Sequence, residues 1–197
     1  MSLAIGGNYD HVGQIELDIL RHAGLCDGSS IVDIGCGSGR LASALSRSGL
    51  KISYLGTDIV KKLLDYAAKK SDRSFKFKLH RELSIPVPDA SVDMICAFSV
   101  FTHLYHHESY IYFADAMRSL RNGGRFVFSF LEFAEPAHWQ VFKDTPKAPH
   151  LNAFIERPVI RLWAEKLGFE VREFIDAATA VEGSSALGQS TVILTKN

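Results

Sequence analysis

The sequence predicts a doubly wound α/β fold, in which helices cover both faces of a largely parallel sheet. Hydrophobic periodicity switches repeatedly between the helical and the strand type, and a glycine-rich turn joins the first buried strand to the helix after it. Parallel strands joined by crossover helices let each such element bury its apolar side. Because 47% of the 197 residues are apolar, the chain can build one sizeable core, and we expect a single domain over residues 1–197.

In the first half of the chain, helical and strand spacing alternate three times. Helices place apolar residues three or four apart, whereas a half-exposed strand alternates apolar and polar residues, as the phenylalanines and lysines after Arg73 do. A candidate cap at Asp10 begins the first helix, and Gly24 and Gly49 end the first two. The expected elements are, in order, a helix over 10–24, a strand over 31–34, a helix over 41–49, a strand over 52–56, a helix over 60–67 and a strand over 75–79.

The second half repeats the alternation and closes with two strands. The pair Gly123 and Gly124 breaks a helix before a strongly β-prone stretch. Pro158 begins the last helix and Gly168 ends it. The expected elements are a strand over 92–98, a helix over 110–120, a strand over 125–131, a helix over 158–167, and strands near 169–174 and 191–195.

Composition and charge argue against several classes of protein. Lys+Arg and Asp+Glu balance at 22 each, so no overall basic field exists to hold nucleic acid or an anionic membrane surface. No apolar run reaches the roughly 18 residues of a membrane span, and the beginning of the chain lacks a secretory signal pattern, so we expect a cytoplasmic protein. Cys26, Cys36 and Cys96 are odd in number and widely spaced, which fits reduced thiols.

The most informative stretch is the glycine-rich turn over residues 35–39, between the first strand and the second helix. Its glycines allow a tight bend and let a ligand contact the main chain. Arg40 stands where a dinucleotide fingerprint needs a third glycine. Asp33, just before the turn, would repel a pyrophosphate but can accept hydrogen bonds from an ammonium group.

Asp58 gives the turn a second acidic neighbour. It ends the second strand, about 20 residues beyond the turn, where a carboxylate can bind both hydroxyls of a ribose. The favoured ligand is therefore a nucleoside that carries an ammonium and a carboxylate, and S-adenosylmethionine has that shape. Two alternatives stay open: a nicotinamide-dependent oxidoreductase with a modified glycine loop, and a protein that binds S-adenosylmethionine without turnover.

Four segments, taken in order and spacing, resemble the motifs of the class I S-adenosylmethionine-dependent methyltransferases of the bacterial small-molecule type. They are residues 32–39, Asp58, residues 86–93 and residues 119–125. The resemblance implies a Rossmann-like sheet of about seven strands, with the last strand antiparallel and inserted, and a ligand at the carboxyl ends of strands one, two and four. It also implies methyl transfer to an oxygen or nitrogen of a small or medium-sized acceptor.

By position in these motifs, the resemblance implies a set of contacts to S-adenosylmethionine. Asp33 would hold the ammonium group, Asp58 the ribose, and Ile59 one face of the adenine. The other implied contacts are Gly35, Cys36, Gly37 and Gly39 along the methionine part, Glu82 and Leu83 near the adenine amine, and Phe98 and Ser99 after the fourth strand. The family often has an acidic residue near the adenine, where this chain reads His80–Leu83.

The beginning of the chain carries a further resemblance. Residues 6–13 look like a segment that folds over the cofactor or substrate in a bacterial branch of the family. We therefore expect residues 1–28 to form an N-terminal covering segment and helix, with Tyr9 in contact with the ligand. A disordered leader is the alternative interpretation.

Methyl transfer to a hydroxyl needs a base, for which histidine is the usual choice. The candidates are His103, His106, His107, His138 and His150. We favour His103, because it follows the fourth strand where an acceptor would approach; a structural hydrogen-bonding role is the alternative. No carboxylate near the clustered histidines completes a set of metal ligands, so we expect no metal.

Residues 132–156 fit none of the expected elements. They contain prolines, aromatic residues and histidines without a clean period, and we expect an insertion on the substrate side. Its aromatic residues and Phe130 would either shape an apolar acceptor pocket or pack on the sheet as an ordinary cover. These aromatic residues are Phe133, Trp139, Phe142 and Phe154.

Overall fold

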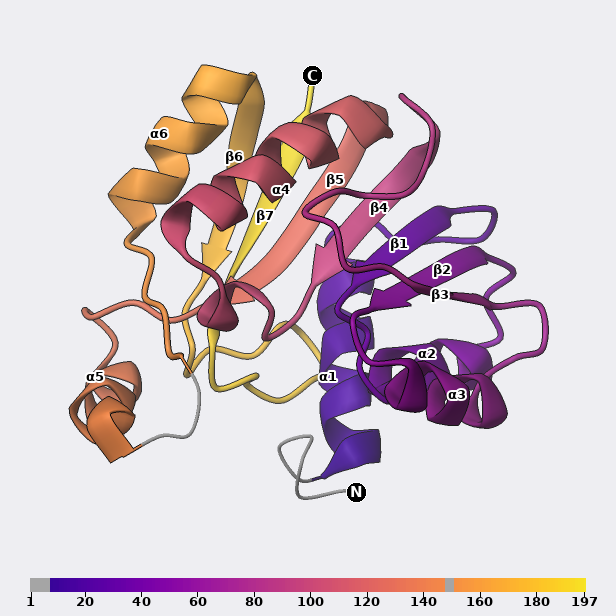
Figure 1. The fold of residues 1–197 in the computed structure, drawn as a ribbon, viewed down its shortest axis with the longest axis horizontal. Coiled ribbons are helices and arrows are strands. Elements are labelled where there is room, and N and C mark those ends of the chain that lie inside the picture. The colour runs from indigo at the N-terminus through magenta and orange to yellow at the C-terminus, as the bar shows by residue number, and fades with distance from the viewer. Residues whose placement is uncertain (1–7, 148–150) are drawn as a thin grey trace.

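The computed structural model describes residues 8–147 and 151–197. In these residues, seven strands form one sheet in the order β3-β2-β1-β4-β5-β7-β6 (Figure 1). The strands are β1 Ser30–Ile34, β2 Ser53–Asp58, β3 Lys76–Leu79, β4 Val92–Ala97, β5 Leu120–Phe130, β6 Phe169–Ile175 and β7 Ser190–Lys196. Strands β1 to β5 pair in parallel, whereas β7 runs antiparallel to both β5 and β6. The predicted doubly wound sheet with an inserted antiparallel last strand is confirmed.

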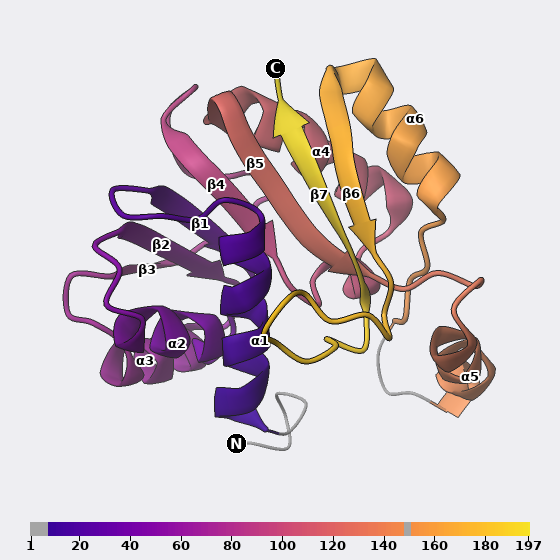
Figure 2. The same ribbon diagram turned by 180° about the vertical axis from the view of Figure 1, so that it is seen from behind.

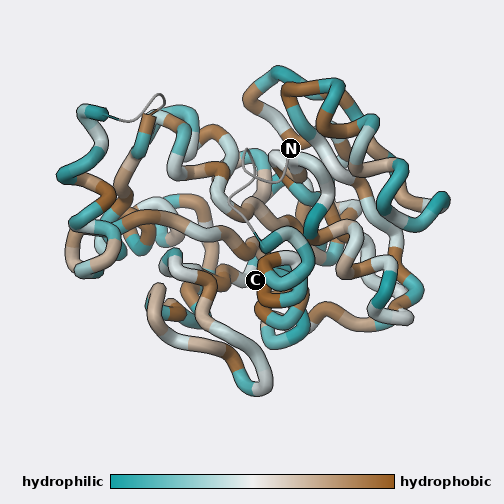
Figure 3. Tube along the Cα trace, turned by 90° about the horizontal axis from the view of Figure 1, so that it is seen from below, coloured by the Kyte–Doolittle hydropathy of each residue, from teal (hydrophilic) through white to brown (hydrophobic). Residues whose placement is uncertain are grey.

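Helices cover both faces of the sheet, and each face has its own buried apolar cluster (Figures 1 and 2). On one face lie α1 (Tyr9–His22), α2 (Arg40–Arg47) and α3 (Lys61–Lys70), and on the other lie α4 (His106–Ser119) and α6 (Arg157–Leu167). Hydrophilic and hydrophobic residues alternate along the helical turns (Figure 3), as expected of helices with one buried side. Among the residues described, no helix is both long and apolar enough to cross a membrane.

Two local predictions were wrong. Helix α1 begins at Tyr9, and Asn8 precedes it with a φ of 54° and no side-chain capping bond. Asp10 lies inside the first turn, where its carboxylate pairs with Arg47 at 3.1 Å, so it is not the cap. Gly123 and Gly124 lie within β5 and do not end the preceding element, because β5 pairs with β4 on both sides of them and accommodates them as an irregularity.

Residues 132–156 contain a helix that the sequence pattern did not reveal, α5 (Pro136–Asp144), which a 3-10 turn over Thr145–Lys147 follows. The helix stands away from the central sheet (Figures 1 and 2). The rings of Phe133, Trp139, Phe142 and Phe154 pack on one another with centroids 4.7–6.0 Å apart. Phe130 does not join them, because it lies fully buried in the core of the sheet.

Candidate active site

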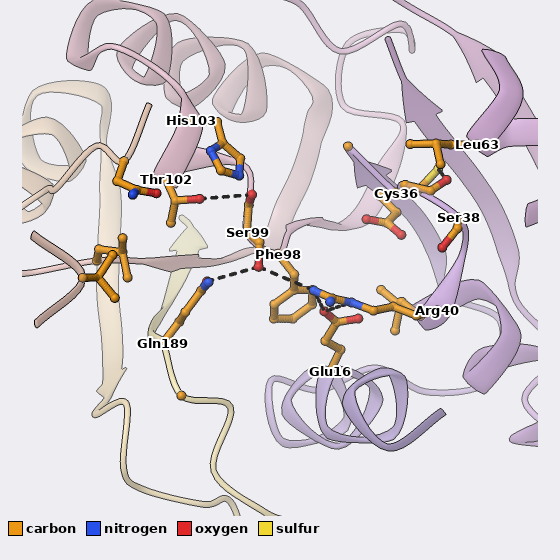
Figure 4. A pocket seen from close by; sticks show the side chains of 18 of the residues that line it. Glu16, Cys36, Ser38, Arg40, Leu63, Phe98, Ser99, Thr102, His103 and Gln189 are labelled. Carbon is orange, nitrogen blue, oxygen red and sulfur yellow. Dashed lines mark hydrogen bonds and ion pairs between the residues drawn. The ribbon is translucent and has the colours of Figure 1, made fainter. Parts of the chain in front are cut away.

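A cleft of about 700 Å³ opens at the carboxyl ends of β1 and β4 (Figure 4). Its walls come from the glycine turn after β1, the segment after β4, the end of β5, helix α5 and the loop before β7. Open α/β sheets bind ligands where neighbouring crossovers leave in opposite directions, and this cleft lies there, because α2 and α4 cover opposite faces.

The glycine turn is built from backbone conformations that other residues rarely adopt. Gly35, Gly37 and Gly39 have φ values of 64°, 56° and 80°. A Cβ atom at Gly35 would lie 2.6 Å from Cγ2 of Val100, and one at Gly39 would lie 2.6 Å from Cβ of Ala67 on α3. The turn therefore approaches its neighbours too closely for any side chain at these two positions.

Replacing Gly39 by alanine is expected to destabilise the fold more than replacing Gly49 by alanine. Both glycines have nearly the same φ, 80° and 78°, but a Cβ at Gly49 meets nothing within 4 Å. The left-handed conformation costs alanine about 1–2 kcal/mol at either site. The collision with Ala67 adds about 1–3 kcal/mol at Gly39 alone. Urea denaturation of the two variants measures the difference, and equal free energies of unfolding would contradict the proposed close packing of α2 and α3.

Asp33 lies at the floor of the cleft and is buried. Its Oδ2 accepts a hydrogen bond of 2.7 Å from the hydroxyl of Tyr54. Burial outweighs the lowering effect of the hydrogen bond from Tyr54 and, with a smaller contribution from the carboxyl of Glu16, raises the pKa of Asp33 to about 7. A cation in the cleft would favour the charged form of this carboxyl.

Asp58 ends β2 and holds the glycine turn from the other side. Its Oδ2 accepts a hydrogen bond of 2.9 Å from the amide of Gly37, and its Oδ1 accepts one of 2.8 Å from the amide of Val60. Asp58 is not among the residues that line the cleft, but Gly37 is. The carboxylate thus sits directly behind the turn, within one hydrogen bond of the cleft wall.

Sequence reasoning missed an ion pair that crosses the cleft floor. Arg40 Nε and Nη2 lie 2.7 and 2.6 Å from Oε1 of Glu16, which is only 1% exposed (Figure 4). Burial raises the pKa of Glu16, and the positive charge of Arg40 opposes that effect. The sequence contained a hint of this pair, because Glu16 lies four residues after Val12 and three before Ile19, on the apolar side of α1. An acidic residue in such a position is seldom buried without a partner.

Phe98 and Ser99 line the cleft as expected, directly after β4. Ser99 has a φ of 59°, which is rare for a residue other than glycine. Its amide donates a hydrogen bond of 2.7 Å to Oγ of Ser129 on β5, and its hydroxyl lies 3.5 Å from Nη2 of Arg40. The strained backbone is therefore held in place from two sides.

Tyr9 covers the glycine turn from the first turn of α1. Its hydroxyl donates a hydrogen bond of 2.9 Å to the carbonyl oxygen of Ser38. Partial burial, with smaller contributions from Tyr66 and Asp10, raises the pKa of Tyr9 to about 12, so the hydroxyl keeps its proton. Residues 1–7 of the expected covering segment lie outside the described residues.

Three expected adenine contacts do not line the cleft. Ile59 is 62% exposed, beyond the end of β2. Glu82 is exposed, and its carbonyl oxygen accepts a hydrogen bond of 3.4 Å from Tyr112. Leu83 packs against the apolar cluster beneath α4.

Two of the candidate histidines line the cleft, His103 and His138. His103 Nδ1 lies 2.9 Å from the carbonyl oxygen of Leu151. Because a carbonyl only accepts, Nδ1 carries the hydrogen, which makes Nε2 the basic nitrogen of the neutral ring. His138 is saturated, since its Nδ1 accepts from the amide of Glu132 and its Nε2 faces the carbonyl of Gly188 at 3.2 Å.

The other candidates lie elsewhere. His106 Nε2 lies 2.8 Å from the carbonyl oxygen of Phe154, and the ring of His107 stacks on Tyr105; neither histidine lines the cleft. His150 lies outside the described residues. Within residues 8–147 and 151–197, no three His, Cys, Asp or Glu side chains are placed to hold a metal ion.

Comparison with known proteins identifies the family. Residues 32–128 match a family described as a methyltransferase domain. Over this segment the chain is a methyltransferase domain, and a relative described as a probable S-adenosylmethionine-dependent methyltransferase is 26% identical to it over 153 residues. The chain is 32% identical over 111 residues to a demethylmenaquinone methyltransferase of Deinococcus radiodurans, and the aligned region covers 54% of this chain and 44% of that protein. It is 27% identical over 178 residues to a ubiquinone biosynthesis O-methyltransferase of Nitrosococcus oceani, and the aligned region covers 82% of this chain and 72% of that protein.

Solved methyltransferases share the fold. Magnesium protoporphyrin IX methyltransferase of Synechocystis PCC 6803 superimposes with a TM-score of 0.70, over 95% of this chain and 85% of that one, at 18% identity. At that identity the likeness shows the fold alone. The chain spans about half the length of several curated relatives that it matches.

Cys36 of this methyltransferase turn is buried and lines the cleft. Burial raises the pKa of its thiol well above the ordinary range, and the charges of Asp33 and Asp58 raise it further. A thiol that keeps its proton is a poor nucleophile. Cys36 is therefore a small wall residue of the methyltransferase turn.

Proposed function

We propose that this chain transfers a methyl group from S-adenosylmethionine to an oxygen or nitrogen of a small or medium-sized acceptor. The observation that carries the proposal is the bend of three left-handed glycines, with Asp33 on the floor of the cleft and Asp58 behind the bend. The names of two relatives, which describe methylation of quinone-type small molecules, support it. The magnesium protoporphyrin IX methyltransferase was solved with bound S-adenosylhomocysteine.

The groups in the cleft fit this cofactor. Oγ of Ser38, inside the glycine turn, is buried with no hydrogen-bond partner among the described residues, so it offers a polar contact to a ligand. Arg40 is paired with Glu16, which leaves the buried carboxyl of Asp33 for a ligand with positive charge, and such a ligand would favour its charged form. The proposed binding residues that line the cleft are Asp33, Gly35, Cys36, Gly37, Phe98 and Ser99. Outside that lining, the position in the motifs supports Gly39, Asp58, Ile59, Glu82 and Leu83, and the bond to Ser38 supports Tyr9.

Positioning supplies most of the rate enhancement in this proposal. Bound S-adenosylmethionine supplies a methyl group on a positively charged sulfur, which is already a good leaving group. Holding the reactants in line can contribute about 7–11 kcal/mol. His103 faces the cleft with Nε2 as its basic nitrogen, and it would take the proton of an acceptor hydroxyl.

The segments have distinct roles in this proposal. We assign residues 1–28 to a covering segment and helix, and residues 132–156 to the acceptor side of a single domain over residues 1–197. Ala137 and Val141 of α5, together with Asn152, line the cleft, which supports the second assignment. The balanced charge supports a small-molecule partner over nucleic acid, and a cytoplasmic location agrees with the sequence pattern.

Replacing Asp58 by alanine is expected to weaken binding of S-adenosylmethionine about tenfold to a hundredfold, because charge-assisted hydrogen bonds to the ribose are lost. Isothermal titration measures the affinity. Asp65→Ala is the matched control, since Asp65 is an exposed acid on α3 that pairs with Lys61. Unchanged affinity in Asp58→Ala would remove Asp58 from the site, and no binding to the folded parent protein would overturn the proposed function.

A further inference from the structure

Gln189 reaches into the cleft from the loop before β7 (Figure 4). Its side-chain oxygen accepts two hydrogen bonds, one of 2.7 Å from Oγ of Ser129 and one of 3.3 Å from Oγ of Ser99. No motif includes this residue, and the assigned cofactor contacts do not use it. The amide oxygen of Gln189 therefore has a structural role in binding the two serines, whereas the role of the amide nitrogen is unassigned.

The two serines fix which way the amide faces. Ser129 is fully buried, and its Oγ already accepts from the amide of Ser99 at 2.7 Å, so its own proton needs an acceptor. Oε1 of Gln189 supplies that acceptor. Oγ of Ser99 lies 3.5 Å from a donor of Arg40, so its proton points to the same oxygen. A flipped amide would leave the buried proton of Ser129 unsatisfied, which is costly.

The amide nitrogen of Gln189 consequently faces away from the serines. Among the described residues, none accepts a hydrogen bond from this Nε2, although the side chain lines a cleft of about 700 Å³. Nearby polar groups are committed elsewhere: the hydroxyl of Thr102 donates to the carbonyl of Ser99 at 3.2 Å, and both ring nitrogens of His138 have partners. Gln189 thus presents two oriented N–H donors to the cleft.

The surroundings of Gln189 point to an uncharged ligand. Leu131 follows Phe130, which pairs with Ser190, and Ala137 precedes His138, whose ring lies 3.2 Å from the carbonyl oxygen of Gly188, so two apolar lining residues lie near Gln189. The charged groups of the lining have partners of their own: Arg40 pairs with Glu16, and Asp33 accepts a hydrogen bond from Tyr54. A neutral molecule with an oxygen that accepts a hydrogen bond matches this wall.

We infer that Gln189 is a specificity-determining residue, whose Nε2 donates to an oxygen of the methyl acceptor. This inference rests on the proposed methyl transfer and deepens it. It assigns the acceptor to neutral molecules that carry, besides the methylated group, a carbonyl, hydroxyl or ether oxygen. Molecules with a protonated amine in that place are disfavoured, because an ammonium group has no lone pair to accept from Nε2 and two donors would face each other.

Gln189→Glu tests the assignment while it keeps an oxygen that accepts from the two serines. A carboxylate still accepts from Ser99 and Ser129, but it replaces the N–H donors by an acceptor. The probes are 2′-hydroxyacetophenone, with a carbonyl beside its phenol, and 2-hydroxybenzylamine, with an amine there. Their dissociation constants are measured by titration into protein saturated with S-adenosylhomocysteine. The melting temperature and the affinity for S-adenosylhomocysteine are recorded for each variant.

We expect Gln189→Glu to bind 2′-hydroxyacetophenone about tenfold to a hundredfold more weakly than the parent protein, and 2-hydroxybenzylamine more tightly. Its melting temperature and cofactor affinity should stay at parent values. Equal changes for both probes, no change, or no binding of 2′-hydroxyacetophenone to the parent protein would overturn the assignment. Failure of the proposed function would show instead as no binding of S-adenosylmethionine to the parent protein.

Discussion

Replacing Arg40 by methionine is expected to lower the free energy of unfolding by about 3–5 kcal/mol, because it leaves the carboxyl of Glu16 buried without its charged partner. Glu16 is 1% exposed and Arg40 17%, so water cannot replace the lost interaction. Chemical denaturation of the ligand-free protein at neutral pH measures the loss. The double variant Glu16→Leu with Arg40→Met should recover most of it, because neither charge of the pair then remains.

Arg47→Met is the matched control for this prediction. Arg47 lies on the same helix, two turns further along, and its partner Asp10 is 77% exposed. An exposed pair contributes about 0–1 kcal/mol, so this variant should unfold almost like the parent protein. If Arg40→Met were no more destabilised than Arg47→Met, the buried pair would not be holding α1 and α2 together.

Replacing His103 by glutamine is expected to lower kcat for a hydroxyl acceptor by about a hundredfold to ten-thousandfold, the usual contribution of a general base. Affinity for S-adenosylmethionine should stay unchanged, because the expected cofactor contacts are other residues. The amide of glutamine can still donate a hydrogen bond to the carbonyl oxygen of Leu151, so the contact that holds residue 151 is kept. Steady-state methyl-transfer kinetics and a cofactor titration measure the two quantities.

His106→Gln separates catalysis from packing. His106 binds the carbonyl of Phe154 just as His103 binds that of Leu151, but it does not line the cleft. A general base at residue 103 predicts a large loss of kcat in His103→Gln and a small one in His106→Gln. Equal losses would show that both histidines only anchor residues 151–154.

The fold could be predicted because each α/β element carries its own local pattern. Strands buried on both faces, such as β4 and β7, read as continuous apolar runs, and the helices show one apolar side. Helix α5 was not predicted from the sequence, because its aromatic rings pack on one another and on flanking loops, so no single apolar face repeats along it. The full length of β5 was not predicted, because glycines usually indicate a break in an element, whereas here pairing with β4 continues on both sides of them.

The candidate site was predictable where the backbone itself makes it. The glycine turn and the acids around it follow from local requirements on φ and from the ends of strands. The pair of Glu16 and Arg40 and the orientation of Gln189 depend on residues 24 and 60 or more positions apart. Such contacts leave no periodic trace, and only the buried acid on the apolar side of α1 gave a hint.

Helix α5, which we propose as the wall for the methyl acceptor, contributes little to the central core. It is held by its own cluster of rings and by His138, which bridges Glu132 and Gly188. Side chains such as Val141 can therefore be exchanged without loosening the strands that carry the glycine turn. Under the proposed function, the strands that hold the cofactor and the helix that recognises the acceptor are separable, so substitutions in one short helix would redirect the same fold to other compounds.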